Sequence, residues 1–73
     1  MKTVTETAIE ATLAALAERL EKAAAQAAEA AQAMKEGKQN LAIGTALDLE
    51  KLLPEANALY TAAVTMHRNS AKD

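Results

Sequence analysis

The chain has no cysteine, tryptophan or phenylalanine among its 73 residues, and it has only two glycines, one proline and one histidine. Without cysteine it can form neither a disulfide nor a thiolate metal site, and a single histidine, His67, cannot by itself build a histidine metal site. We therefore expect no metal and no cofactor. Association with further chains is then the remaining way to stabilise so short a sequence, because small domains rarely bury a sufficient core alone.

The sequence also lacks the motifs that position catalytic groups. It has no Gly-x-Ser-x-Gly motif, and its two glycines, Gly37 and Gly44, are not followed by the Lys-Ser/Thr pair of a phosphate-binding loop. Its acidic residues lie off the apolar stripe described below, on faces that we expect to be solvated. We therefore predict that the protein is not an enzyme.

A strong charge of one sign is absent as well. Eight basic and ten acidic residues give a net charge of −2, which disfavours nucleic acid as a partner. The longest apolar run, 23–34, is interrupted by polar residues and is too short to cross a bilayer. The first residues lack an apolar stretch after a basic region, so we expect neither a signal peptide nor a membrane segment, and we predict a cytoplasmic protein.

Alanine is what the sequence has in abundance, with 20 residues. The stretch 5–36 contains no glycine or proline, and its apolar residues recur at alternating spacings of four and three, which predicts one long helix with an apolar heptad seam. Thr5 is the expected N-cap, and Gly37 suits the left-handed position beyond the C-terminus. The seam consists of Ile9, Leu13, Leu16, Leu20, Ala23, Ala27, Ala30 and Met34.

A second helix is predicted over 41–69, after a turn at 37–40. Two N-caps compete: Asn40, which we prefer because a four-residue turn is common between antiparallel helices, and Thr45, which begins a weak capping box. Pro54 lies inside this helix, and because the apolar spacing continues in phase through it, we predict a kink there rather than a break. The seam of this helix is Leu49, Leu52, Ala56, Leu59, Ala63 and Met66, with Leu53, Tyr60 and His67 as a parallel row on one flank.

These patterns predict an all-α protein of one domain over 1–73. It is an antiparallel helical hairpin that assembles into a homo-oligomeric helix bundle, either a dimeric four-helix bundle or a higher oligomer. More than half of its apolar residues are alanine, so two helices alone have little to bury between them. The apolar face of the second helix is also wider than one neighbour needs. The expected oligomer interface comprises Leu13, Leu16, Leu20, Ala23, Ala27, Leu49, Leu52, Leu53, Ala56, Leu59 and Tyr60.

Two functional hypotheses of different classes follow from this assembly. The first is a self-associating module that acts as a protein-interaction adaptor or an inhibitor of another protein. The second is an oligomer that sequesters a small anionic ligand, because a helix N-terminus with lysines beside it can bind phosphate or carboxylate groups. A nucleic-acid-binding hairpin is a third hypothesis, disfavoured by the net charge. The candidate contacts for an anionic ligand are Lys35, Lys38, Asn40, Tyr60 and Arg68.

The second predicted helix contains three short runs: Leu41-Ala42, Leu49-Glu50 and Ala56-Asn57-Ala58. Their order resembles that in one arm of the phage-encoded helical-hairpin proteins that sequester cyclic-nucleotide immune signals. The resemblance covers residues 38–60, and Glu55 stands where that family often has a tryptophan. It implies an oligomer that binds cyclic di- or trinucleotides at the junctions between subunits.

Overall fold

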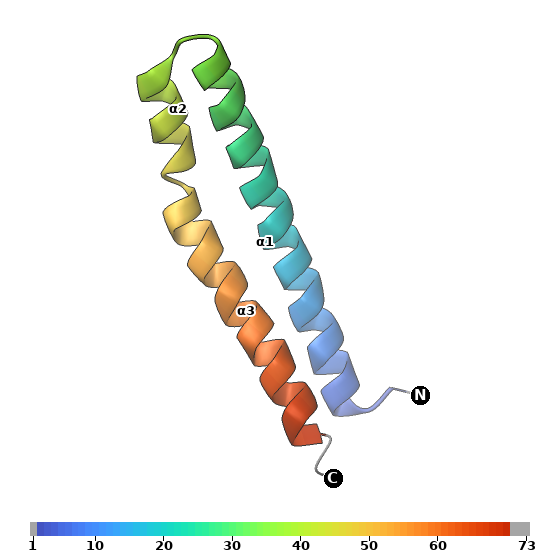
Figure 1. Cartoon of the computed structure of the whole chain (residues 1–73). Helices are drawn as coiled ribbons and strands as arrows, with labels where there is room; N and C mark the ends of the chain where they lie inside the picture. Colours follow the sequence, from blue (N-terminus) through green and yellow to red (C-terminus); the bar gives the residue numbers. More distant parts are fainter. Residues whose placement is uncertain (1, 71–73) are drawn as a thin grey trace.

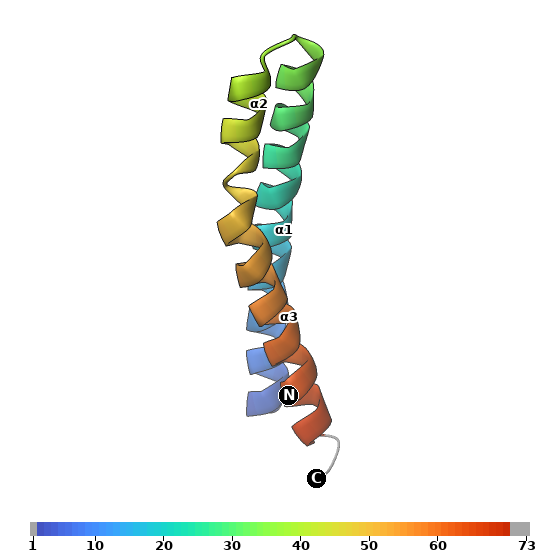
Figure 2. The ribbon, with the colours of Figure 1, turned by 60° about the vertical axis from the view of Figure 1, so that its left-hand side comes forward.

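The computed structural model describes residues 2–70, which form an antiparallel helical hairpin (Figure 1). One arm is α1 (Val4–Lys35), and the other arm consists of α2 (Gln39–Ala46) followed by α3 (Leu49–Ser70). The second arm is bent by 27°. The two arms lie side by side in both views, and the hairpin is a rod with extents of 55 × 20 × 12 Å (Figure 2). The prediction of an all-α hairpin is therefore confirmed.

The N-terminus of α1 is fixed by Thr3 rather than by the predicted Thr5. The Thr3 hydroxyl accepts a hydrogen bond from the backbone N–H of Glu6 at 3.0 Å, and the Glu6 carboxylate accepts one from the backbone N–H of Thr3 at 3.3 Å. This reciprocal pair is a capping box, and it needs a glutamate three residues after the cap. Thr3 has that glutamate and Thr5 does not, so the helix begins at Val4.

The C-terminus of α1 closes on Gly37, as the sequence predicts. Gly37 has a φ of 77°, in the left-handed region that suits glycine. Its N–H donates to the Met34 carbonyl at 3.0 Å, while the N–H of Lys38 donates to the Ala33 carbonyl at 2.9 Å. These two bonds form a Schellman motif, which satisfies the last carbonyls of α1 and reverses the chain.

The second arm starts earlier than either sequence alternative. Lys38 occupies the N-cap position of α2 without a side-chain capping bond, and the helix begins at Gln39, so neither Asn40 nor Thr45 is the cap. The tight Schellman closure explains the difference, because it turns the chain within fewer residues than the predicted turn at 37–40.

The second arm is interrupted between α2 and α3, at Leu47 and Asp48. There the N–H of Asp48 donates to the Thr45 carbonyl at 3.4 Å, a three-residue spacing tighter than that of an α-helix. Asp48 directly precedes α3, a position that aspartate favours. Helix α3 then continues through Pro54. The arm is bent, as predicted, but it is not one continuous helix, because it is interrupted at Leu47 and Asp48, upstream of the proline.

The core between the two arms is built from alanine. Because alanine carries only a methyl group, two helix backbones can approach closely, but little apolar area is buried per residue. No large side chain among residues 2–70 is fully buried. Of the described residues, five are buried, with 4–7% of their surface exposed: Ala23, Ala33, Ala42, Ala56 and Ala63.

The predicted seam of α3 lies at the contact with α1, since all six of its residues are buried or half-buried. On α1, only every second residue of the predicted seam lies at the contact with the second arm. Ile9, Leu16, Ala23 and Ala30 are buried or half-buried, whereas Leu13, Leu20, Ala27 and Met34 are exposed. The contact on α1 is completed instead by a more polar row: Thr5, Thr12, Arg19, Gln26 and Ala33.

Candidate functional site

One side of the hairpin carries large apolar side chains that are about half exposed. Leu13 of α1 and Tyr60 of α3 lie on either side of a shallow groove and are 47% and 56% exposed. Leu20 and Leu53 lie seven residues from Leu13 and Tyr60, so they extend the same two rows, and they are 48% and 51% exposed. We call these four residues the apolar face. The groove itself is lined by Ile9, Leu13, Tyr60, Ala63, Val64 and His67.

The apolar face continues along the second arm to the bend. Leu53 also lines a second shallow groove, which passes over the junction of α2 and α3. Two further apolar side chains, Ile43 and Leu47, line this groove and are 56% and 54% exposed. Neither residue belongs to a predicted seam, because both precede Leu49, where the regular heptad spacing of the second arm begins.

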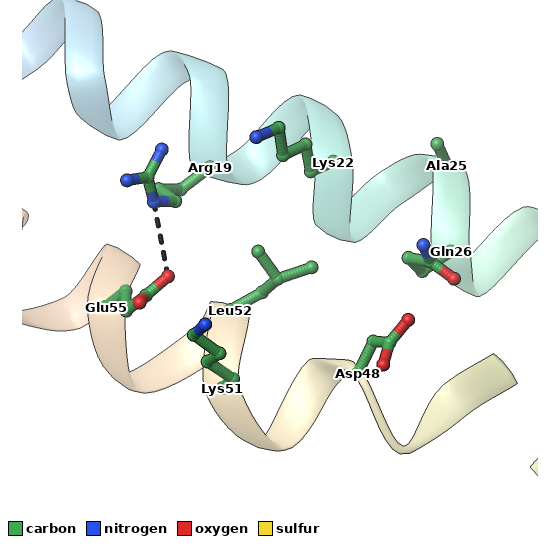
Figure 3. Close-up of a pocket in the computed structure, with 8 residues that line it drawn as sticks. All are labelled: Arg19, Lys22, Ala25, Gln26, Asp48, Lys51, Leu52 and Glu55. Carbon is green, nitrogen blue, oxygen red and sulfur yellow. Dashed lines mark hydrogen bonds and ion pairs between the residues drawn. The ribbon is translucent and has the colours of Figure 1, made fainter. Parts of the chain in front are cut away.

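The other side of the hairpin is polar. On α1, Lys22 lies two residues from Leu20, and two residues correspond to roughly 200° of helix rotation, so their side chains leave the helix in nearly opposite directions. Arg19 donates from Nε to a carboxylate oxygen of Glu55 at 3.2 Å and so joins the two arms (Figure 3). A groove on this side, which we call the polar groove, is lined by Arg19, Lys22, Ala25, Gln26, Asp48, Lys51, Leu52 and Glu55.

Five residues of the predicted oligomer interface are exposed and available to a second chain: Leu13, Leu20, Ala27, Leu53 and Tyr60. The other six are buried or half-buried at the contact between the two arms of one chain: Leu16, Ala23, Leu49, Leu52, Ala56 and Leu59.

The candidate anion contacts are not gathered at one place within a single chain. Lys35, Lys38 and Asn40 lie near the turn, whereas Arg68 lies near the far end of α3 and Tyr60 belongs to the apolar face (Figure 1). A binding site that used all five would need more than one chain.

The charges at the turn are partly paired with each other. The Glu36 carboxylate accepts a hydrogen bond from the Gln32 amide at 3.0 Å and lies 3.1 Å from the Lys38 ammonium. These two contacts, the Gln32 bond first, hold the pKa of Glu36 below its ordinary value. Lys38 is thus in contact with a carboxylate of its own chain.

The described helices include no segment with both the length and the apolar character needed to cross a membrane. Across residues 2–70, no three histidine or acidic side chains are grouped so that they could hold a metal ion. No protein-family model, curated protein or solved structure matches the chain. The structure therefore defines its class by fold: a helical hairpin with one apolar and one polar side.

Proposed function

We propose that this protein is a non-enzymatic interaction module that associates with copies of itself through the apolar face and acts as an adaptor or inhibitor of another protein. The observation that carries the proposal is the half-exposed state of Leu13, Leu20, Leu53 and Tyr60 on one side of the hairpin. Contiguous apolar surface of this kind marks interaction sites on soluble proteins.

The total surface of the hairpin supports the same proposal. The chain exposes 5446 Å². A compact monomer of the same mass would expose roughly 4300 Å², so the hairpin has an excess of about 1100 Å². A stable protein–protein interface removes about 800 Å² from each partner. The excess is thus large enough for one full interface per chain.

The decisive test is the mass of the protein in solution. Sedimentation equilibrium at low micromolar concentration should give a multiple of the 7.7 kDa chain mass. The melting temperature should rise with protein concentration, because association stabilises the folded state by mass action. A single 7.7 kDa species that melts cooperatively, with a midpoint independent of concentration, would contradict self-association.

A second candidate function is the sequestration of a small anionic ligand such as a cyclic dinucleotide. Its support is the presence of Lys35, Lys38 and Asn40 around the turn, beside the N-terminus of α2. Thermal melting with and without cyclic dinucleotides tests it, since a ligand that binds the folded state raises the melting temperature. No rise at millimolar ligand, together with a protein partner that binds stoichiometrically in purified form, would favour the adaptor.

A further inference from the structure

The outward surface of α1 carries a second heptad seam that no part of the chain covers within residues 2–70. Its residues are alternately four and three positions apart in the sequence. None of them is charged, and all of them are exposed. Along the helix it alternates leucine with alanine, continues in alanine and ends in methionine. The second seam consists of Leu13, Ala17, Leu20, Ala24, Ala27, Ala31 and Met34.

The second seam lies on the side of α1 where a further helix would pack in a four-helix bundle. Relative to the contact with the second arm, it is rotated by roughly 100° about the axis of α1. Two neighbours of one helix in a square bundle lie about a right angle apart. The stripe between the two contacts, which includes Leu16 and Leu20, would then point into the centre of the bundle.

We infer that the second seam is covered by α1 of a second copy of this chain, which runs antiparallel to the first about a twofold axis near Ala24. The inference rests on the proposed self-association and adds the contacting helix, its direction and its register. The seam extends from Leu13 to Met34, and Ala24 lies next to its midpoint. Only a pairing centred there covers the whole seam in both copies, and a twofold axis makes the two halves identical.

The side chains of the seam fit this register. It places Leu20 of one copy opposite Ala27 of the other, so that a large side chain meets a small one. At the axis, Ala24 meets its own symmetry mate. Alanine at the centre lets the two α1 backbones approach closely, and alanines are also the buried residues of the hairpin itself.

The charges at the two ends of α1 favour the antiparallel direction. Glu6 lies in the first turn of α1, followed one turn later by Glu10, and Lys35 lies in its last turn. Glu10 also pairs with Lys2 of its own chain. With the axis near Ala24, an antiparallel pair places Lys35 of one copy about three residues along the helix from Glu10 of the other, and it opposes the two helix dipoles. A parallel pair would place like ends together.

Single cysteine variants test the arrangement directly, because the natural chain has no cysteine. In the full-length protein under mild oxidation, Ala24→Cys should form a disulfide-linked dimer on a non-reducing gel. Ala17→Cys and Ala31→Cys should each remain uncrosslinked alone, since the antiparallel pairing separates equivalent residues, but should crosslink when the two variants are mixed. The matched control is Ala25→Cys, which lies on the polar groove and should not crosslink.

Other crosslinking results would correspond to a different arrangement of the chains. Crosslinking of Ala17→Cys with itself would show parallel α1 helices and would refute the inference, although self-association would stand. A dimer by sedimentation in which Ala24→Cys does not crosslink would show that another helix covers the seam. A monomeric natural chain would refute both the inference and the proposed function. Circular dichroism of every variant confirms that the helical fold is retained.

Discussion

Substitution of Leu20 by alanine should weaken self-association by a predictable amount. Leu20 is 48% exposed in the single hairpin, so about half of its side chain remains to be buried by a second chain. Complete burial of a leucine side chain contributes roughly 1.5–3 kcal/mol, which makes the remaining half worth roughly 1 kcal/mol. A symmetric dimer contains this residue twice. The loss is then about 2 kcal/mol per dimer, which corresponds to a roughly 30-fold increase in the dimer Kd.

Sedimentation equilibrium over a dilution series measures this change. The matched control is Leu41→Ala, because Leu41 is 57% exposed on α2 and lies outside the apolar face. Its dimer Kd should stay close to that of the natural chain. Circular dichroism should show unchanged helix content for both variants. Equal effects of the two substitutions, or no effect of Leu20→Ala, would refute the assignment of the apolar face as the contact between chains.

Three further predictions concern the hairpin itself. Ala63→Leu should destabilise the hairpin by roughly 1–3 kcal/mol in urea denaturation, because Ala63 is only 5% exposed between the arms. The control Ala62→Leu, on the exposed surface, should have little effect. Equal effects of the two substitutions would contradict an alanine core. Gly37→Ala should lower stability by about 1 kcal/mol because Gly37 has a φ of 77°, and an unchanged urea midpoint would argue against the Schellman closure. Gln32→Ala should raise the pKa of Glu36 towards its ordinary value in a carboxyl NMR titration. Because the pKa of Glu36 is lowered in the folded state, the Gln32–Glu36 contact stabilises the fold at pH values above the ordinary pKa of glutamate. This contribution disappears as the pH falls through the lowered pKa. If the pKa of Glu36 does not change in the Gln32→Ala variant, the contact is not formed in solution.

The fold could be predicted from the sequence because its causes are local. Apolar spacing, alanine content and the absence of glycine and proline inside 5–36 determine a long helix. A glycine directly after the helix determines where the chain reverses, since few other residues adopt a positive φ. The regular spacing of the second arm likewise identified which of its residues lie against α1.

The exact helix boundaries were less predictable because several residues of similar type competed for the same role. Thr3 and Thr5 can both cap a helix, and the reciprocal bond with Glu6 decides between them. Asn40 is a better N-cap than Lys38 by residue type. The hydrogen bonds of the Schellman motif nevertheless reverse the chain so early that α2 begins at Gln39, before Asn40. The interruption at Leu47 and Asp48 has no proline or glycine to mark it in the sequence, and the three-residue hydrogen bond from Asp48 to Thr45 shows it only in the structure.

The rotation of α1 about its own axis was decided only by the tertiary structure. The apolar stripe of α1 is wide enough to present either Leu13 and Leu20 or Thr12 and Arg19 to the second arm. Heptad spacing predicts the leucines. In the folded hairpin the buried residues are all alanine, whereas Leu13 and Leu20 are 47% and 48% exposed.

Arg19 tolerates the inward position because it forms an ion pair with Glu55 across the two arms. The amino-acid sequence by itself therefore determined two striped helices joined by a tight glycine turn, because spacing and propensity act along the chain. Which side of each stripe the hairpin covers, and which side it leaves exposed, depends on contacts between residues far apart in the sequence, so only the tertiary structure decides it.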